Sequence, residues 1–453
     1  MQLYPFQQEG VENLVKRRSV LFADEMGLGK TVQAAVALRC LFDSRSISRV
    51  LIAAPIALTR NWKSELRKWA ALPGVLYEGG SRYGLLEGNA AVLIGSYETI
   101  CSDLEVATRG GERFHDLGID VLIIDEAQRI KTPETVRARV LAKIVAPRRW
   151  AITGTPLENR PRELASILRY LFPNEFETAD SLEDLPRILA YRDQAMFRRT
   201  KGMVGLQLPS KTVANISVAL SPDQAAEYSQ RLNDLKQELA RGSGDRASLM
   251  RLLAGIQDLR RIAVISSNQD SSKLDFLESQ LENICSNGEK AVVFSSFANI
   301  ALPLFRERLS RFGAVLYTGA MSTDERERIH QRFIEDPSTR VMCASLKAAG
   351  VGLTWTVASH VFHTDVWWNP QVLNQADDRV HRIGQQKPVL VRRLVADGTI
   401  EEAINQLLET KEDIFKMVVD EAPPASITQR TYADLLALIG LKSAARSSPE
   451  KTY

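Results

Sequence analysis

Short apolar runs alternate with amphipathic segments along the first third of the chain. After a predicted helix at residues 7–15, segments with helical spacing occupy residues 31–42 and 60–70. The apolar runs are continuous, as in strands that are covered on both faces of a parallel sheet. They lie at residues 20–23, 50–58, 92–100, 121–124 and 150–160. This alternation predicts a doubly wound parallel sheet.

The pattern changes after residue 161 and later begins again. Helical spacing dominates residues 162–172, 182–197, 222–240 and 247–265, and residues 212–220 alternate like a strand. The polar, turn-rich segment SSNQDSS at 266–272 predicts a domain boundary. Beyond it we expect helices at 273–285, 300–312 and 323–336, and strands at 291–297, 314–319, 341–345 and 360–366.

These patterns predict the domain organisation. The 453 residues correspond to two to four units at about 150 residues each. The expected fold class is α/β, with two doubly wound parallel-sheet lobes and a helical insertion between them. The first lobe is expected at 1–220, with a helical protrusion at 160–200, and a helical linker follows at 221–271. The second lobe is expected at 272–420, and 421–453 should form a C-terminal helix and disordered tail.

The first predicted strand leads into a glycine-bearing turn, DEMGLGKT, just before a helix. Gly27 and Gly29 allow consecutive backbone N–H groups to face inward and surround a phosphate. Lys30 can reach β- and γ-phosphates, and the Thr31 hydroxyl can bind Mg²⁺. Asp24 stands where the strict phosphate-loop pattern has glycine, so an ordinary glycine turn before a helix is the alternative.

An acidic pair follows the apolar run at 121–124. In open α/β sheets, ligands bind at the carboxyl ends of the strands, where this pair is expected to lie. Asp125 is placed to hold Mg²⁺, and Glu126 to orient or deprotonate a water molecule. The alternative is a pair of surface carboxylates at the end of a strand.

Composition narrows the function classes only slightly. The chain is 45% hydrophobic and 25% charged with a net charge of +3, so nucleic-acid binding would depend on local clusters of Arg and Lys. The four cysteines form no C-x-x-C pair, and His360 and His363 have no acidic or thiol partner nearby in sequence, so no zinc site is expected. No signal pattern or apolar run of about 18 residues occurs, so we expect no membrane segment and a cytoplasmic protein, nucleoid-associated if bacterial.

Six segments in a fixed order carry a family resemblance. They are DEMGLGKT, DEAQ, ITGTP, ASLKAAGVGL, DVWWNP and QADDRVHRIGQ. Together they resemble the Swi/Snf-type ATPases, the DNA-translocating branch of superfamily-two helicases, over residues 3–412. The resemblance implies two RecA-like lobes with ATP and Mg²⁺ in the cleft and nucleic acid across their outer face.

The resemblance also implies roles for individual residues. Gln7 looks like the adenine-reading glutamine, and Asp24 is the usual family residue at its position. Gln375 begins the motif whose Arg379 and Arg382 reach toward the γ-phosphate. The implied catalytic residues are Lys30, Asp125, Glu126, Arg379 and Arg382. The implied nucleotide-binding residues are Gln7, Asp24, Gly27, Gly29, Lys30, Thr31 and Gln375, with Thr31 and Asp125 as Mg²⁺ ligands.

Other segments match those that grip nucleic-acid phosphates in the family. The implied contacts are Asn61, Trp62, Ser96, Tyr97, Ser295, Ser296, Thr318, Gly319, Lys347, Gly350 and Gly352. Trp367 and Trp368 either pack in the core or touch the strand. The chain departs from the family at Gln128, where many relatives have His, and at Ala349, Thr354 and Trp355.

We therefore expect a DNA-dependent ATPase that moves along double-stranded DNA without separating the strands, with specificity supplied by a partner protein. One alternative is a strand-separating helicase on DNA or RNA. Another is a nucleotide-dependent clamp or scaffold with little turnover. The complete catalytic set argues against the clamp.

Overall fold

The computed structural model describes residues 2–105, 117–130, 135–154, 161–176, 185–206, 208–240, 246–349, 354–368, 370–410 and 435–441. The chain divides into two compact units, Met1–Leu208 and Pro209–Tyr453. Within the described residues, no helix is both long enough and apolar enough to cross a bilayer.

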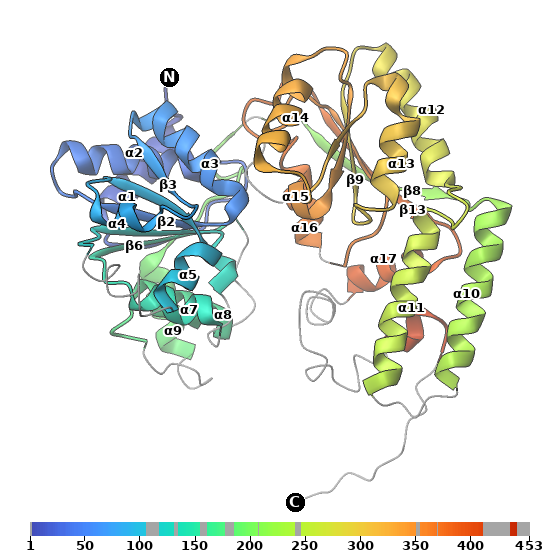
Figure 1. Ribbon diagram of the computed structural model, residues 1–453, viewed down its shortest axis with the longest axis horizontal. Coiled ribbons are helices and arrows are strands. Elements are labelled where there is room, and N and C mark those ends of the chain that lie inside the picture. The colour runs from blue at the N-terminus through green and yellow to red at the C-terminus, as the bar shows by residue number, and fades with distance from the viewer. Residues whose placement is uncertain are drawn as a thin grey trace, which may run out of the picture. The chain divides into compact units, whose positions relative to one another are not determined.

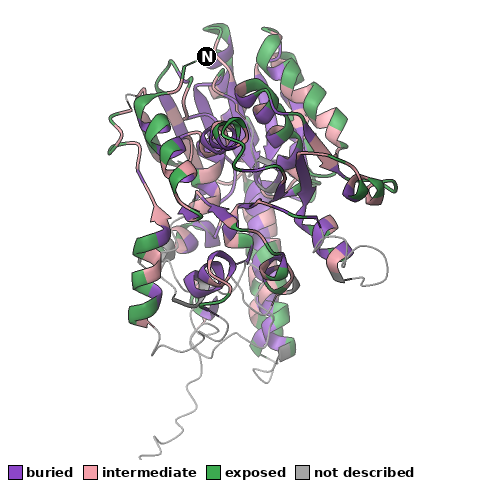
Figure 2. Cartoon of the chain, turned by 90° about the vertical axis from the view of Figure 1, so that its left-hand side faces the viewer, coloured by how far each residue is buried: buried purple, intermediate pink, exposed green. Residues whose placement is uncertain are grey.

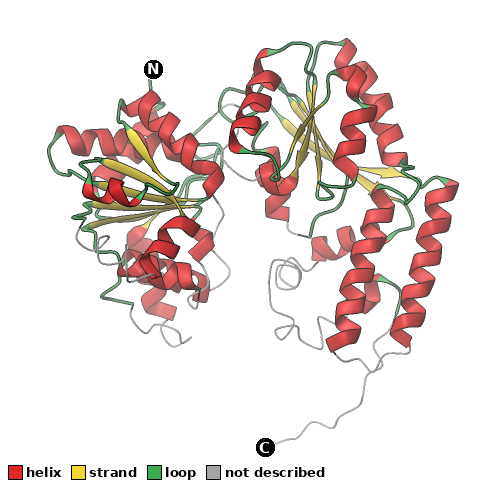
Figure 3. Ribbon diagram, viewed as in Figure 1, coloured by secondary structure: helices red, strands yellow, loops and turns green. Residues whose placement is uncertain are grey.

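The first unit contains a seven-stranded parallel sheet in the order β3-β4-β2-β5-β6-β1-β7. Its strands are β1 (Ser19–Phe22), β2 (Val50–Ala54), β3 (Gly74–Tyr77), β4 (Val92–Ser96), β5 (Val121–Asp125), β6 (Arg148–Ile152) and β7 (Met196–Phe197). Its helices are α1 (Pro5–Lys16), α2 (Lys30–Asp43), α3 (Ile56–Glu65), α4 (Tyr83–Glu87), α5 (Tyr97–Glu105), α7 (Val136–Lys143), α8 (Pro161–Leu171) and α9 (Leu185–Ala195). Figures 1 and 3 show helices on both faces of this sheet.

Coverage on both faces explains why the strands are continuous apolar runs. Every residue of β2, β4 and β5 is buried, and Figure 2 shows the strands almost wholly buried beneath helices with exposed outer faces. The pairing register places Ile152 opposite both Phe22 and Asp125. The carboxyl ends of β1, β5 and β6 therefore meet at one edge of the sheet.

The second unit contains a six-stranded parallel sheet in the order β10-β11-β9-β12-β13-β8. Its strands are β8 (Lys211–Val218), β9 (Ala291–Ser295), β10 (Val315–Tyr317), β11 (Val341–Ser345), β12 (His360–His363) and β13 (Val389–Ala396). Its helices are α10 (Pro222–Ala240), α11 (Arg246–Val264), α12 (Ser272–Ser286), α13 (Ala301–Arg308), α14 (Thr323–Glu335), α15 (Leu346–Ala349), α16 (Pro370–Asp377) and α17 (Ile400–Thr410). The two sheets confirm the predicted α/β fold class.

The division between the units lies earlier than the sequence analysis placed it. Residues 211–218 were assigned to a first lobe ending at 220, yet β8 pairs with β13 along its whole length. The helices expected as a linker at 221–271 also belong to the second unit. A pairing between segments so distant in sequence leaves no signal in local periodicity. The structure therefore divides the chain at Leu208, ahead of the turn-rich segment 266–272.

The helices α10 and α11 form a hairpin in the second unit (Figure 1). They approach closely at Gly255, because a Cβ there would lie 2.4 Å from the Leu235 side chain. The hairpin shares a hydrophobic core with Ile400 and Ile404 of α17 and with Leu435.

Candidate functional site

The predicted phosphate loop joins β1 to α2. Gly27 and Gly29 have φ angles of 88° and 76°, in the left-handed region that favours glycine. Lys30 Nζ donates hydrogen bonds to the backbone carbonyl groups of Asp24, at 2.7 Å, and Glu25, at 3.2 Å. A Cβ on Gly154 would lie 3.3 Å from Lys30 Nζ. The loop and the residues after β6 therefore surround the Lys30 ammonium group.

The Asp24 side chain, predicted to bind nucleotide, pairs with an arginine of the same unit. Its carboxylate is fully buried and pairs with the Arg199 guanidinium group, with Nη2 2.6 Å from Oδ2 and Nε 3.1 Å from Oδ1. The Arg199 backbone N–H also donates to Asp24 Oδ1 at 2.9 Å. Asp24 therefore anchors the loop to the segment that follows β7. Sequence reasoning missed Arg199, because no motif spacing relates it to Asp24.

Gln7, the predicted adenine-reading residue, lies against the loop. Its Nε2 group donates to the Leu28 carbonyl at 3.3 Å, and Gln33 Nε2 donates to the same carbonyl at 2.9 Å. Gln7 Oε1 accepts from the Tyr4 N–H at 3.1 Å. A Cβ on Gly29 would lie 2.7 Å from Gln7 Nε2, so this side chain requires glycine there. The Gln7 amide retains one donor and one acceptor position beyond these bonds.

Asp125 is the last residue of β5 and is almost fully buried. Its Oδ2 accepts from Trp62 Nε1 at 2.8 Å, and its Oδ1 accepts from the Glu126 N–H at 2.9 Å. Burial and the like charge of Glu126 together raise the pKa of Asp125 to about 7, while the Trp62 hydrogen bond and the Lys30 charge oppose the shift. A nearby cation would therefore favour the charged carboxylate.

Glu126 has a left-handed backbone conformation with φ at 54°, which is uncommon outside glycine and occurs often at functional sites. Its Oε2 accepts from Gln128 Nε2 at 2.5 Å, and Gln128 Oε1 accepts from the Thr153 hydroxyl at 2.8 Å. Gln128, the departure from the family pattern, thus links the ends of β5 and β6.

The residues around Lys30 fit a magnesium–nucleotide complex. Mg²⁺ prefers oxygen ligands and is usually held by one or two protein groups together with substrate phosphates. The Asp125 carboxylate and the Thr31 hydroxyl are of this type. In the part of the chain that the structure describes, no group of three or more His, Cys, Asp or Glu side chains could hold a metal by itself.

Several predicted nucleic-acid contacts in the first unit are buried. Trp62 and Tyr97 are fully buried, and the Tyr97 hydroxyl donates to the Asp125 backbone carbonyl at 2.6 Å. Ser96 Oγ accepts from the Thr99 N–H at 3.1 Å at the start of α5. Trp62 and Tyr97 therefore hold Asp125 in place, and only Asn61 of this predicted set is partly exposed.

The predicted arginines of the second unit lie on a well-packed turn. Gln375 is on α16, and Arg379 and Arg382 follow it, all three partly buried. The Trp355 N–H donates to the Arg379 carbonyl at 2.7 Å, and Gln385 Nε2 donates to the Ala358 carbonyl at 2.8 Å. The turn that carries both arginines is therefore fixed by one backbone hydrogen bond and one side-chain hydrogen bond.

The predicted nucleic-acid contacts of the second unit also differ in exposure. Ser295 and Thr318 are buried, Ser296 is partly buried and Gly319 is exposed. Trp368 is buried, which agrees with a structural role. Gly350, Gly352 and the side chain of Lys347 lie outside the described residues.

Comparison with known proteins adds independent evidence. Residues 6–266 match the SNF2-related domain, and residues 272–384 match the helicase conserved C-terminal domain. The chain is 32% identical to an uncharacterized ATP-dependent helicase of Mycoplasma genitalium and 29% identical to the DNA annealing helicase and endonuclease ZRANB3 of Mus musculus. These alignments cover 92% and 91% of this chain but 42% and 40% of the two relatives, so the chain spans less than half of their length.

A solved structure also aligns with the chain. The Sulfolobus solfataricus SWI2/SNF2 ATPase core in complex with dsDNA matches over 98% of both chains at 28% identity, with a TM-score of 0.44.

Proposed function

The chain belongs to the SNF2-related family, and on this premise we propose that it is an ATP-dependent motor that moves along double-stranded DNA. Family membership confirms the resemblance predicted from the sequence and supports an ATP hydrolase. The observation that carries the proposal is the convergence of Lys30, the Asp125–Glu126 pair and Gly154 at one edge of the first sheet.

In the proposed reaction, the loop N–H groups and Lys30 bind the ATP phosphates. Thr31 and Asp125 would hold Mg²⁺, which neutralises charge on the β- and γ-phosphate oxygens. Glu126 orients the attacking water and accepts its proton, and its bond to Gln128 fixes the carboxylate direction. Arg379 and Arg382 would stabilise the charge that develops on the γ-phosphoryl group. Gripping backbone phosphates carries no sequence information, so we propose that a protein partner supplies the target specificity.

The ATPase rate without nucleic acid and with duplex DNA, single-stranded DNA or RNA tests this proposal, together with displacement of a third strand from a DNA triplex. We expect duplex DNA to stimulate hydrolysis most strongly and ATP to drive triplex displacement. Separation of duplex strands would favour a helicase, and tight ATP binding without turnover would favour a clamp.

A further inference from the structure

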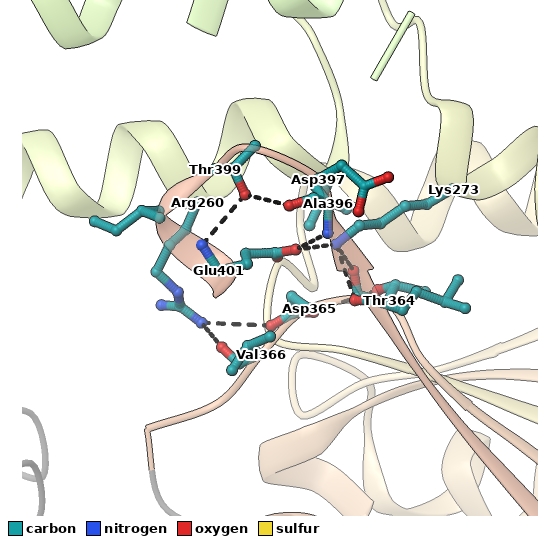
Figure 4. Close-up of polar contacts among 12 residues, drawn as sticks. Arg260, Lys273, Thr364, Asp365, Val366, Ala396, Asp397, Thr399 and Glu401 are labelled. Atoms are coloured by element: carbon teal, nitrogen blue, oxygen red, sulfur yellow. Dashed lines mark hydrogen bonds and ion pairs between the residues drawn. The ribbon is translucent and has the colours of Figure 1, made fainter. Parts of the chain in front are cut away.

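A fully buried arginine of α11, Arg260, points toward Asp365 and Val366, which follow β12 (Figure 4). Arg260 Nη2 donates to the Val366 carbonyl at 2.7 Å and lies 3.6 Å from Asp365 Oδ2. The Arg260 Cζ atom lies 5.5 Å and 5.2 Å from the ring centroids of Trp367 and Trp368. Arg260 is thus held by a carboxylate, a carbonyl and aromatic faces.

The same carboxylate organises the residues that follow β9. Asp365 Oδ1 accepts from the Ser295 hydroxyl at 2.9 Å and from the Ser296 N–H at 3.0 Å. Asp365 Oδ2 accepts from the Ser296 hydroxyl. Phe297 lies over the guanidinium group as well, with its ring centroid 5.6 Å from Arg260 Cζ. Asp365 therefore joins Arg260 to both serines that the family resemblance places against DNA.

We propose that Arg260 is a positioning residue that couples the α10–α11 hairpin to the turn at residues 295–297, and through it to duplex DNA. This inference rests on the proposed function. DNA phosphates are negative, so an uncompensated Asp365 carboxylate beside this turn would oppose their approach. Arg260 supplies the compensating charge and holds Asp365 in the orientation that accepts from Ser296.

Through Arg260, a movement of the α10–α11 hairpin can change the turn at residues 295–297. Arg260 belongs to the helix that meets α10 at Gly255, and the hairpin also packs on α17 and on Leu435. A shift of α11 would be transmitted to Val366 and Asp365, because the Arg260 guanidinium group is held against the segment that follows β12.

A second buried ion pair in the same unit offers a control, whose Glu401 charge also acts on Arg260 but only through space. Lys273 and Glu401 are fully buried, with Lys273 Nζ 2.5 Å from Glu401 Oε2, and Lys273 also donates to the Thr364 carbonyl at 2.8 Å (Figure 4). This pair makes no hydrogen bond to Ser295 or Ser296 in the described structure.

The test compares two double variants of the full chain, Arg260→Met with Asp365→Asn and Lys273→Met with Glu401→Gln. Each removes both charges of a pair, because removing one would leave a buried charge uncompensated. We would measure basal ATPase, the duplex DNA concentration for half-maximal stimulation, and hydrogen exchange in the peptide containing Ser296. The Arg260 double variant should need about tenfold more DNA and exchange faster, because the hydrogen bonds that Ser296 makes to a charged carboxylate are weakened. It should keep its basal rate, because the pair lies in the second unit and the phosphate loop lies in the first.

The control variant should keep DNA dependence and exchange within about twofold of the wild type, which is less than the effect of one hydrogen bond. Arg260→Lys keeps the charge without the guanidinium fork, so it should give intermediate values and serves if the double variant does not fold. Wild-type DNA dependence and exchange in these Arg260 variants would overturn the inference. A wild-type protein that duplex DNA does not stimulate would overturn the proposed function instead, and the exchange data would still decide whether Arg260 positions the turn.

Discussion

Two buried carboxylates of the first unit have different electrostatic surroundings. Asp24 pairs with the Arg199 guanidinium group, so its charge is compensated within the protein. Asp125 faces one indole N–H group and the like charge of Glu126, and its pKa is raised to about 7. A buried carboxylate whose charge is uncompensated is stabilised strongly by an added cation. At the residue scale, the structure therefore separates a carboxylate that anchors the loop from one that is suited to bind Mg²⁺.

Lys30→Ala is expected to abolish ATP turnover. The substitution removes an ammonium group that lies against the loop carbonyls and would attract the ATP phosphates. Steady-state phosphate release measures the effect. Lys16→Ala, which alters an exposed ion pair with Glu12, is the control. Ordinary turnover by the Lys30 variant in a clean preparation would remove the central hypothesis.

Glu126→Gln is expected to bind ATP and persist on DNA while hydrolysis falls by about 10²–10⁴, the usual contribution of a general base. Single-turnover hydrolysis and nucleotide binding separate the two effects. The matched control is Glu98→Gln, which neutralises a carboxylate that is half exposed. Rapid hydrolysis by the Glu126 variant would assign the base to another residue.

Trp62→Phe tests whether the buried indole supports Asp125 rather than DNA. Loss of the Nε1 donor should lower kcat by about tenfold at limiting Mg²⁺, since a hydrogen bond to a charged group is worth about 1.5–3 kcal/mol. The control is Trp150→Phe, because Trp150 is equally buried and its Nε1 has no hydrogen-bond partner within the described structure. A changed DNA affinity with unchanged Mg²⁺ dependence would restore the original interpretation.

At the scale of elements, the sequence predicts which segments form buried strands, but not which strands pair with each other. The runs at 20–23 and 121–124 became buried strands because both faces of the sheet are covered. The strand expected at 50–58 is shorter, because β2 ends at Ala54 and α3 begins at Ile56. No strand was expected at 389–396, where Arg392 and Arg393 interrupt the apolar pattern. Arg392 is partly buried, and its Cζ atom lies 5.2 Å from the Phe362 ring centroid, so the strand tolerates this charged residue.

The site residues show the same limit at the element scale. The motifs predicted Lys30 at the start of a helix and Asp125 at the end of a strand, and these positions follow from β–loop–α geometry. Trp62 and Tyr97 follow strands and carry polar atoms, which fits either DNA contact or support of a neighbour. Only burial distinguishes the two, and burial depends on packing between distant segments.

Arg199→Lys is expected to raise KM for ATP with a smaller effect on kcat, because a lysine cannot reproduce the paired bonds that fix Asp24 beneath the loop. Steady-state kinetics and chemical denaturation measure both parameters and stability. The control is Arg149→Lys, a buried arginine of the same unit whose Nη1 donates to the Tyr170 carbonyl. Equal changes of KM for ATP in both variants would mean that Arg199 contributes only to general stability and not specifically to ATP binding.

At the scale of the whole molecule, the proposed reaction requires groups from both units. The first unit carries the phosphate loop and the acidic pair, and the second carries Arg379 and Arg382 on a fixed turn. Hydrolysis that needs both can respond to whatever brings the units together, which is how DNA binding would control the rate.

Arg379→Ala is expected to retain ATP affinity while the DNA-stimulated rate falls by about 10³ or more, as for other arginines that act on a γ-phosphate. Nucleotide binding and ATPase assays with saturating duplex DNA make the comparison. Arg311→Ala, which removes an exposed arginine of the second unit, is the control. An unchanged stimulated rate would place Arg379 outside the reacting site.

The short strand β7 has a mechanical consequence. It pairs with β1, Arg199 just beyond it holds Asp24, and the chain enters the second unit at Pro209. Tension along the connection between the units would act on the Arg199–Asp24 pair, which anchors the phosphate loop around Lys30. If the protein is the proposed motor, a mechanical load on it would then change its affinity for ATP.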